Sequence, residues 1–307
     1  MSKEAFKHTN FRSGSLALIA KCNEIIEGYQ KQGYDLTLRQ LYYQLVSQDI
    51  IANKQTEYDR LGSIINDARL AGLVDWDAIV DRTRNLRGIY TYSEPEEIIR
   101  DMSIDYAIDK WITQAYRLEV WIEKDALAGV FSRVCNKHQI DYFSCRGYTS
   151  QSEMYVAAKR HQKYLEDGQT PVILHFGDHD PSGIDMSRDI RERLEMFNYG
   201  DPIKVDRLAL NMPQVRKYNP PPNPAKLTDS RVGGYIRLYG NSSWELDALE
   251  PTVLAALVTE AVDEFRDARA WDEKVKQENK ERELLRSIRD NLQDVKDFLR
   301  EKQEEDK

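Results

Sequence analysis

The second half of the chain alternates between short apolar runs and helical stretches, and this alternation constrains the fold more than any other feature. The apolar runs have the length of buried strands and read LEVWI, DYFSC, PVILHF and IKVDRLAL. Helical stretches are expected between them, at about residues 126–138, 150–166 and 184–197. Strands that alternate with helices form α/β domains with a mostly parallel sheet. We therefore expect such a domain at residues 113–250.

The first 90 residues have helical patterns instead. Apolar periodicity predicts helices at about residues 15–30, from residue 37 onward, and at about residues 56–71. Thr37 and Gln40 have the spacing of a capping box, which favours a helix start at that point. A strand-like run, WDAIV, and a basic turn with a glycine come next. Three helices followed by a strand and such a turn are typical of a winged-helix (CAP-like) domain, which we expect at residues 1–90.

Two further segments complete the expected organisation. Residues 91–112 begin with TYSEPEEIIRD and are predicted to form a linker. Residues 251–307 are predicted to form a charged helical C-terminal segment. The expected fold is therefore α/β with a helical N-terminal part, followed by the parallel-sheet domain and the charged tail.

Composition limits the function classes without selecting one. No run of about 18 apolar residues occurs and the N-terminus does not resemble a secretory signal, so we expect a cytoplasmic protein without a membrane partner. The three cysteines have no CxxC spacing, which indicates reduced thiols and excludes a zinc ribbon. The net charge of −8 argues against nucleic acid as a partner. Because the first 90 residues carry roughly +1 and the last 50 roughly −4, the charge distribution weakens that objection.

Acidic residues follow two of the predicted strands. Glu123 comes directly after LEVWI, and Asp178 and Asp180 come after PVILHFG. Ligands of parallel sheets gather beyond the carboxyl ends of the strands, so the three carboxylates converge if the two strands are neighbours. Mg²⁺ prefers hard oxygen ligands of this kind and assists phosphoryl chemistry. The alternative is that the Asp-x-Asp pair only caps a helix or a turn.

The segment LTLRQLYYQLV predicts a helix with two different faces. Its apolar stripe consists of Leu38, Leu41, Tyr42 and Leu45. Arg39 and Tyr43 are four residues apart and project together from nearly the opposite side. We therefore expect Tyr42 in the core and Tyr43 displayed beside a guanidinium, which could stabilise a phenolate or bind a phosphate. The alternative is that Arg39 and Tyr43 are ordinary surface residues.

These motifs together resemble those of the family that contains the topoisomerase VI A subunit and the meiotic double-strand-break transesterase. That family joins a winged-helix domain, which carries a catalytic tyrosine, to a TOPRIM domain. The matching segments are Arg39 with the Tyr42–Tyr43 pair, VWIEKDAL around Glu123 and Lys124, and GDHDPSG at residues 177–183. Weaker matches are RGYTS at residues 146–150 and WELDAL at residues 244–249. The tail after Pro251 has no counterpart in that family, and we expect no fused ATPase domain.

The resemblance implies a type IIB topoisomerase-like activity in which Tyr43 cleaves double-stranded DNA and forms a 5′-phosphotyrosyl link. Arg39 and Glu123 would assist catalysis, and Mg²⁺ would be held by Glu123, Asp178 and Asp180. A homodimer is implied, in which Tyr43 of one subunit approaches the metal site of the other. The residues expected to hold backbone phosphates are Arg60, Arg82, Arg84, Arg87 and Lys124. A separate ATPase (B-type) subunit would be needed for strand passage, and the protein would be nucleoid-associated.

Two other functions remain open on the sequence. In the first, a TOPRIM hydrolase cleaves DNA with a metal-activated water and Tyr43 has no part in the reaction. In the second, the chain is an inactive DNA-binding scaffold. The pairing of Arg39 with Tyr43 favours the tyrosine route over the hydrolase.

Overall fold

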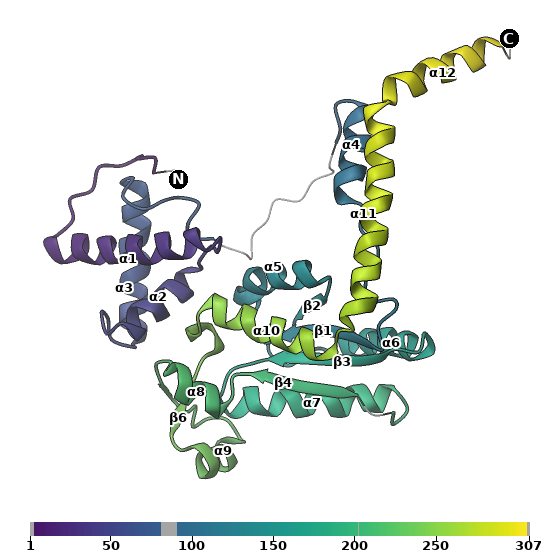
Figure 1. Ribbon diagram of the computed structural model, residues 1–307. Helices are drawn as coiled ribbons and strands as arrows, with labels where there is room; N and C mark the ends of the chain where they lie inside the picture. Colours follow the sequence, from purple (N-terminus) through teal and green to yellow (C-terminus); the bar gives the residue numbers. More distant parts are fainter. Residues whose placement is uncertain (1–2, 81–90, 202, 306–307) are drawn as a thin grey trace. The chain divides into compact units, whose positions relative to one another are not determined.

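The computed structural model describes residues 3–80, 91–201 and 203–305 (Figure 1). The chain divides into two compact units, and each is described by itself. The first unit comprises Met1–Arg84 and Arg117–Val262, and the second comprises Asn85–Tyr116 and Asp263–Lys307.

The N-terminal part of the first unit is helical. Its helices are α1 (Ser13–Lys31), α2 (Leu38–Ser47) and α3 (Gln55–Leu70). The predicted capping box is confirmed, because the Thr37 side chain accepts from the Gln40 amide and the Gln40 side chain accepts from the Thr37 amide. This box satisfies two amides that would otherwise lack a partner at the start of α2. Apolar faces of the three helices form one core, which includes Ile26, Leu41, Leu45, Leu61 and Ile65.

The predicted strand WDAIV is wrong as an extended element. In the part of the chain that the structure describes, this run contributes one isolated parallel bridge, between Leu36 and Ile79. The segment is still tied down, because the Leu36 amide donates to the Ala78 carbonyl at 3.3 Å and the Val80 amide donates to the Leu36 carbonyl at 2.9 Å. The basic turn expected after it, at residues 81–90, lies outside the described residues.

The predicted α/β domain with a parallel sheet is confirmed. The sheet has four strands in the order β2-β1-β3-β4. Their bounds are Tyr116–Ile122 for β1, Asp141–Ser144 for β2, Thr170–Phe176 for β3 and Lys204–Ala209 for β4. The pairs β1–β2 and β3–β4 are parallel, with Trp121 opposite Phe143 and His175 opposite Arg207. The central strands β1 and β3 are neighbours, so the two strands that precede the acidic motifs end side by side.

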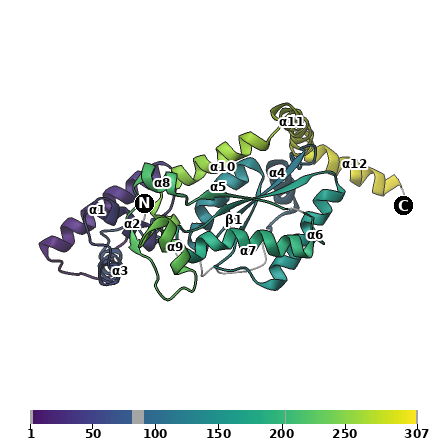
Figure 2. The same cartoon turned by 90° about the horizontal axis from the view of Figure 1, so that it is seen from below.

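Helices cover both faces of this sheet. Figures 1 and 2 show α6 (Gln151–Glu166) and α7 (Pro181–Phe197) on one face, and α5 (Ala128–His138) and α10 (Pro251–Phe265) on the other. On the first face Met154 and Ile190 pack with Trp121 and Ile173 in a buried cluster. On the second face the ring of Phe131 in α5 lies against that of Phe176 in β3, at a centroid distance of 4.6 Å. A strand with both faces covered must be apolar on both sides, which explains the continuous run PVILHF.

Shorter elements connect the sheet to α10. They are the 3₁₀ helix η1 (Asp125–Leu127) after β1, then α8 (Met212–Tyr218), β5 (Asn223–Pro224), α9 (Val232–Tyr239), β6 (Ser242–Ser243) and the 3₁₀ helix η2 (Leu246–Ala248). Strands β5 and β6 form an antiparallel pair. The apolar face of α10 is buried in the first unit through Leu254, Val258 and Val262, although the sequence assigned this helix to the charged tail.

The second unit is built from helices, α4 (Pro95–Asp105), α11 (Ala268–Asp290) and α12 (Leu292–Glu305). The range predicted as a linker therefore contains α4, which lies along α11. Trp111 contacts Trp271 edge to face at a centroid distance of 5.7 Å. The Lys110 ammonium and the Ile108 amide both donate to the Glu278 carboxylate, at 2.5 and 3.0 Å. Across both units, none of the helices described is long and apolar enough to cross a bilayer.

Candidate active site

The ends of β1 and β3 bring two of the predicted acidic residues together. The Glu123 amide donates to the Phe176 carbonyl at 2.8 Å, which joins the two strand ends. The Asp178 amide donates to Oε2 of Glu123, also at 2.8 Å. A Cβ on Gly177 would lie 2.9 Å from Oε2 of Glu123, so a side chain at this position would force the Glu123 carboxylate to shift from the Asp178 amide. The glycine of the GDHDPSG motif therefore has a steric reason.

Asp180 caps the helix that follows. Its Oδ1 accepts from the Gly183 amide at 2.6 Å and from the Ser182 hydroxyl at 3.1 Å, at the N-terminus of α7. Pro181 occupies the first turn, where a missing amide proton does no harm. A Cβ on Gly183 would lie 2.3 Å from the Asp178 carbonyl oxygen, so this position also requires glycine. The helix-capping alternative for this aspartate thus describes a contact that the structure contains.

Lys124 lies inside the acidic cluster. Its ammonium is 2.8 Å from Oδ2 of Asp178 and 3.2 Å from Oδ1 of Asp247, and it also contacts Glu245. The second oxygen of Asp178 accepts from the Leu246 amide at 2.8 Å. We expected Lys124 to hold DNA phosphates, but here its charge faces three carboxylates of the protein.

The pKa values of Asp178 and Glu123 are both raised. Burial raises the pKa of Asp178 to about 8; the charge of Lys124 acts to lower this pKa, and the charges of Glu123, Glu245 and Asp247 act to raise it. Burial also raises the pKa of Glu123, with Asp180 adding to the effect. A bound cation relieves the repulsion between negative charges that are gathered among buried side chains.

The carboxylates of Glu123, Asp178 and Asp180 are chemically suited to Mg²⁺, but they are not arranged as a complete set of ligands around one ion. Carboxylate oxygens are the ligands that Mg²⁺ prefers, and it binds with few of them while keeping several waters. In residues 3–80, 91–201 and 203–305, however, no three His, Cys, Asp or Glu side chains are placed to hold one ion. Oxygens of Glu123, Asp178 and Asp180 bond instead to backbone amides, to Ser182 and to Lys124.

The expectation that Tyr43 is displayed on the surface is wrong. Tyr42 and Tyr43 are each 5% exposed, and their rings contact edge to face at a centroid distance of 5.2 Å. Tyr42 is a core residue as expected, with its hydroxyl donating to Oδ1 of Asn53 at 3.0 Å. Tyr43 is also covered, because the helical core lies on one side of it and a loop of the sheet part, through Asn223, lies on the other.

Arg39 and Tyr43 are paired as the helix spacing predicts. The guanidinium carbon of Arg39 lies 5.7 Å from the centroid of the Tyr43 ring. The same guanidinium forms ion pairs with Glu245 at 2.8 Å and Asp247 at 2.9 Å. Arg39 and Lys124 therefore share the same two carboxylates, and α2 is joined to the segment around η2.

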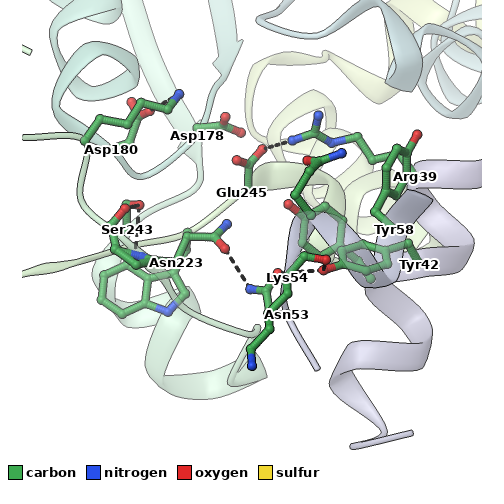
Figure 3. Close-up of a pocket in the computed structure, with 15 residues that line it drawn as sticks. Arg39, Tyr42, Asn53, Lys54, Tyr58, Asp178, Asp180, Asn223, Ser243 and Glu245 are labelled. Carbon is green, nitrogen blue, oxygen red and sulfur yellow. Dashed lines mark hydrogen bonds and ion pairs between the residues drawn. The ribbon is translucent and has the colours of Figure 1, made fainter. Parts of the chain in front are cut away.

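A cavity of about 270 Å³ lies between α2, which carries Tyr43, and the acidic loop, which we define as residues 177–183. Its lining includes Arg39, Tyr43, Asp178, Asp180 and Glu245. Figure 3 shows Asp178 and Asp180 on one side of the cavity and Arg39 on the other, with Glu245 between them. Groups that the sequence placed in two separate domains thus face one space within a single chain.

The environment of Tyr43 keeps its phenol protonated in the absence of a cation. Burial raises the pKa of Tyr43, and the charges of Glu245 and Asp247 raise it further. Arg39 and a hydrogen bond with Asn223 act in the opposite direction but do not prevail. A phenol in this setting becomes nucleophilic only with additional positive charge or a base.

The remaining predicted DNA contacts are placed as follows. Arg60 lies on the exposed part of α3 and bonds to Glu57 of the same helix at 2.6 and 3.0 Å. Arg82, Arg84 and Arg87 lie outside the described residues.

Several residues of the site escaped the sequence reasoning. They are Asn223, Lys226, Glu245 and Asp247, with Arg207 beneath the acidic loop. Glu245 and Asp247 had a signal, because WELDAL was noticed as a motif although no role was assigned to its acids. Asn223 and Lys226 lie in a Pro-rich loop, where no local pattern indicates which side chains turn inward.

Comparison with known proteins adds no assignment. No family model and no curated protein matches this chain.

Proposed function

We propose that this chain cleaves double-stranded DNA by magnesium-dependent transesterification at Tyr43, as a type IIB topoisomerase A-subunit-like enzyme. The cavity that joins Tyr43 and Arg39 to Asp178 and Asp180 is the observation that carries the proposal. Motif order supports it, since the Arg-Tyr-Tyr helix precedes a sheet whose central strands end in Glu123 and in Gly-Asp-x-Asp.

Each group has a chemical role in this reaction. The phenolic oxygen of Tyr43 gives its proton to solvent water and forms a bond to the phosphorus, and the bond from phosphorus to the 3′-oxygen breaks. Arg39 would bind the phosphate oxygens with its paired donors, after exchanging them for its present carboxylate partners. Glu123 would give a proton to the leaving 3′-oxygen, and its raised pKa favours that role. Mg²⁺, when held by Asp178 and Asp180, and by Glu123 once it has given up this proton, would supply positive charge that neutralises the phosphate.

The finer fold assignment belongs to the same proposal. We propose that residues 1–90 form a winged-helix domain and residues 113–250 a TOPRIM domain. Three helices followed by a bridged segment, and a parallel sheet with acidic strand ends, support this. A homodimer on DNA and a separate ATPase subunit for strand passage follow from the resemblance alone. The structure holds one chain and its cavity lies within that chain, so exchange of the tyrosine between subunits rests on the resemblance too.

One observation favours the TOPRIM hydrolase as a second candidate. A ring that is only 5% exposed must be reached through the cavity, whereas a metal-activated water needs no access to Tyr43. The two candidates share the acidic loop and differ in whether protein becomes linked to DNA.

A covalent trapping experiment tests the proposal. Protein, Mg²⁺ and a duplex labelled at its 3′ ends are mixed and then denatured with detergent, and the label is followed on a gel. Transesterification predicts label that moves with the protein, lost in both Tyr43→Phe and Asp178→Ala. Free 5′-phosphate ends without an adduct, retained in Tyr43→Phe, would support the hydrolase. Cleavage that is unchanged in both variants would remove the proposed site altogether.

A further inference from the structure

An arginine without a carboxylate partner lies beneath the acidic loop. Arg207 is on β4, opposite His175 of β3. Although Glu123, Asp178 and Asp180 are all near enough to act on its charge, Arg207 has no ion pair within 4.0 Å among the residues that the structure describes. Its guanidinium is directed instead at the backbone that carries those carboxylates.

The guanidinium of Arg207 binds both ends of the acidic loop. One terminal nitrogen donates to the Gly183 carbonyl at 2.8 Å. The other donates to the carbonyls of Asp178 at 2.6 Å and Gly177 at 3.1 Å. The loop therefore closes around the planar donor fork, with its first residues on one nitrogen and its last on the other.

Two further contacts outside the acidic loop hold the guanidinium in place. It donates to the Leu210 carbonyl at 3.3 Å and to the Ser187 hydroxyl at 3.3 Å. Ser187 in turn is 2.7 Å from Nδ1 of the fully buried His175. The guanidinium is thus held by α7 and by the residue that follows β4, and not by the loop alone.

The glycines of the loop leave room for this arrangement. A Cβ on Gly177 would lie 3.2 Å from a terminal nitrogen of Arg207, and one on Gly183 would lie 2.3 Å from the Asp178 carbonyl oxygen. A side chain at position 183 would displace the Asp178 carbonyl that Arg207 binds, and one at position 177 would crowd the guanidinium. The two glycines and Arg207 therefore act together to hold the loop, although the sequence indicated only the glycines.

We propose that Arg207 is a positioning residue for the acidic site, because its guanidinium fixes the backbone of residues 177–183 and thereby the carboxylates of Asp178 and Asp180. The inference rests on the proposed function for what those carboxylates bind, but the fixing of the loop does not depend on it. Lysine cannot replace the guanidinium, because a single ammonium has no planar fork for carbonyls on two sides. Arg207 thus acts on bound cations through the loop and without contact to them.

Hydrogen exchange and cation binding together test this role. The variants are Arg207→Gln and Arg207→Lys, with Arg191→Gln as the matched control. Arg191 lies on α7 and donates to the Val205 carbonyl of β4 at 3.1 Å, away from the loop. Amide exchange is measured by mass spectrometry on peptides that cover residues 177–184, and Mn²⁺ affinity is measured by calorimetry on the full chain.

We expect amides of the loop to exchange at least about tenfold faster in both Arg207 variants, with peptides from α5 and α6 unchanged, and Mn²⁺ affinity to fall roughly 10- to 100-fold. Arg191→Gln should match the wild type in both measurements. Loop exchange equal to that of the wild type, or a uniform rise across the first unit, would overturn the inference. So would wild-type Mn²⁺ affinity in Arg207→Lys. If the wild type itself binds no Mn²⁺, the proposed metal site fails, and loop exchange alone decides the role of Arg207.

Discussion

Replacing Lys124 by Met tests whether this lysine balances the acidic cluster or binds DNA. The substitution keeps most of the side-chain volume and removes the charge that faces Asp178, Glu245 and Asp247. The side chains of Asp178 and Asp247 are 6% and 0% exposed, so water cannot replace the ammonium effectively. Removing one partner of a buried ion pair costs about 3 kcal/mol or more.

A loss of about 3 kcal/mol corresponds to a fall in Tm of roughly 6–12 °C for a unit of this size. The control is Lys226→Met, because Lys226 is 3.6 Å from Asp180 and its side chain is 68% exposed. An exposed pair of this kind contributes at most about 1 kcal/mol. Circular dichroism melts of the two variants at pH 7.5, without divalent cations, give the comparison directly.

Mg²⁺ should then restore more stability to Lys124→Met than to the wild type. The variant lacks the only ammonium that contacts these three carboxylates in the described chain. A cation that binds only the folded state adds about 2.7 kcal/mol of stability when its concentration is 100 times its Kd. A melt of Lys124→Met that matches Lys226→Met would refute this reasoning. A normal melt combined with weaker, less salt-dependent DNA binding would support the phosphate-binding role instead.

Three further outcomes follow from individual contacts. Although burial alone would raise it, hydrogen bonds from Arg160 hold the pKa of Glu119 well below its usual range, so Glu119→Gln should destabilise the first unit by about 3 kcal/mol at pH 7. That difference should shrink as the pH falls below about 4.5, where the unfolded carboxylate takes up a proton, and urea unfolding at several pH values measures it. Mg²⁺ affinity should rise with pH up to about 8 and then level off, since the ion must displace the proton of Asp178, as calorimetry across pH 6–9 would show. Arg39→Lys should lower adduct formation at least about tenfold in the trapping assay while leaving the melt within a few degrees, because the paired donors are lost and the charge is kept.

Each of these has an outcome that contradicts it. For Glu119, an equal loss at pH 7 and pH 3.5 would show that packing and not charge is responsible. A Mg²⁺ affinity that does not change with pH would mean that binding of the ion displaces no proton from Asp178. Adduct yields for Arg39→Lys that equal those of the wild type would remove the phosphate-binding role of the guanidinium.

The sequence predicted the fold where local pattern and tertiary burial agree. The run PVILHF is apolar on both sides because β3 is covered by helices on both faces, and the capping box at Thr37 forms because it needs only four adjacent residues. WDAIV has the composition of a strand, but it gains one bridge to Leu36 and no further partner in the described residues. A strand depends on a neighbour that composition cannot supply.

The site was predictable to a similar limit. Strand order brings Glu123 to Asp178, and helix spacing brings Arg39 to Tyr43, so both pairs could be expected from local rules. The burial of Tyr43 could not, because one of its partners, Asn223, is 180 residues away along the chain. Arg207 escaped for the same reason, since nothing in KVDRLA shows that one arginine will bind a loop from a neighbouring strand.

Identification of the residue linked to DNA tests the central claim most directly. Protein trapped with a duplex and Mg²⁺ is digested with nuclease and protease, and the peptide that retains a nucleotide is sequenced by mass spectrometry, with Tyr42→Phe as the matched control for Tyr43→Phe. We predict a 5′-phosphotyrosyl nucleotide on Tyr43, present in Tyr42→Phe at a reduced yield and absent in Tyr43→Phe. A nucleotide on any other residue, or cleaved DNA without a linked peptide, would contradict the account.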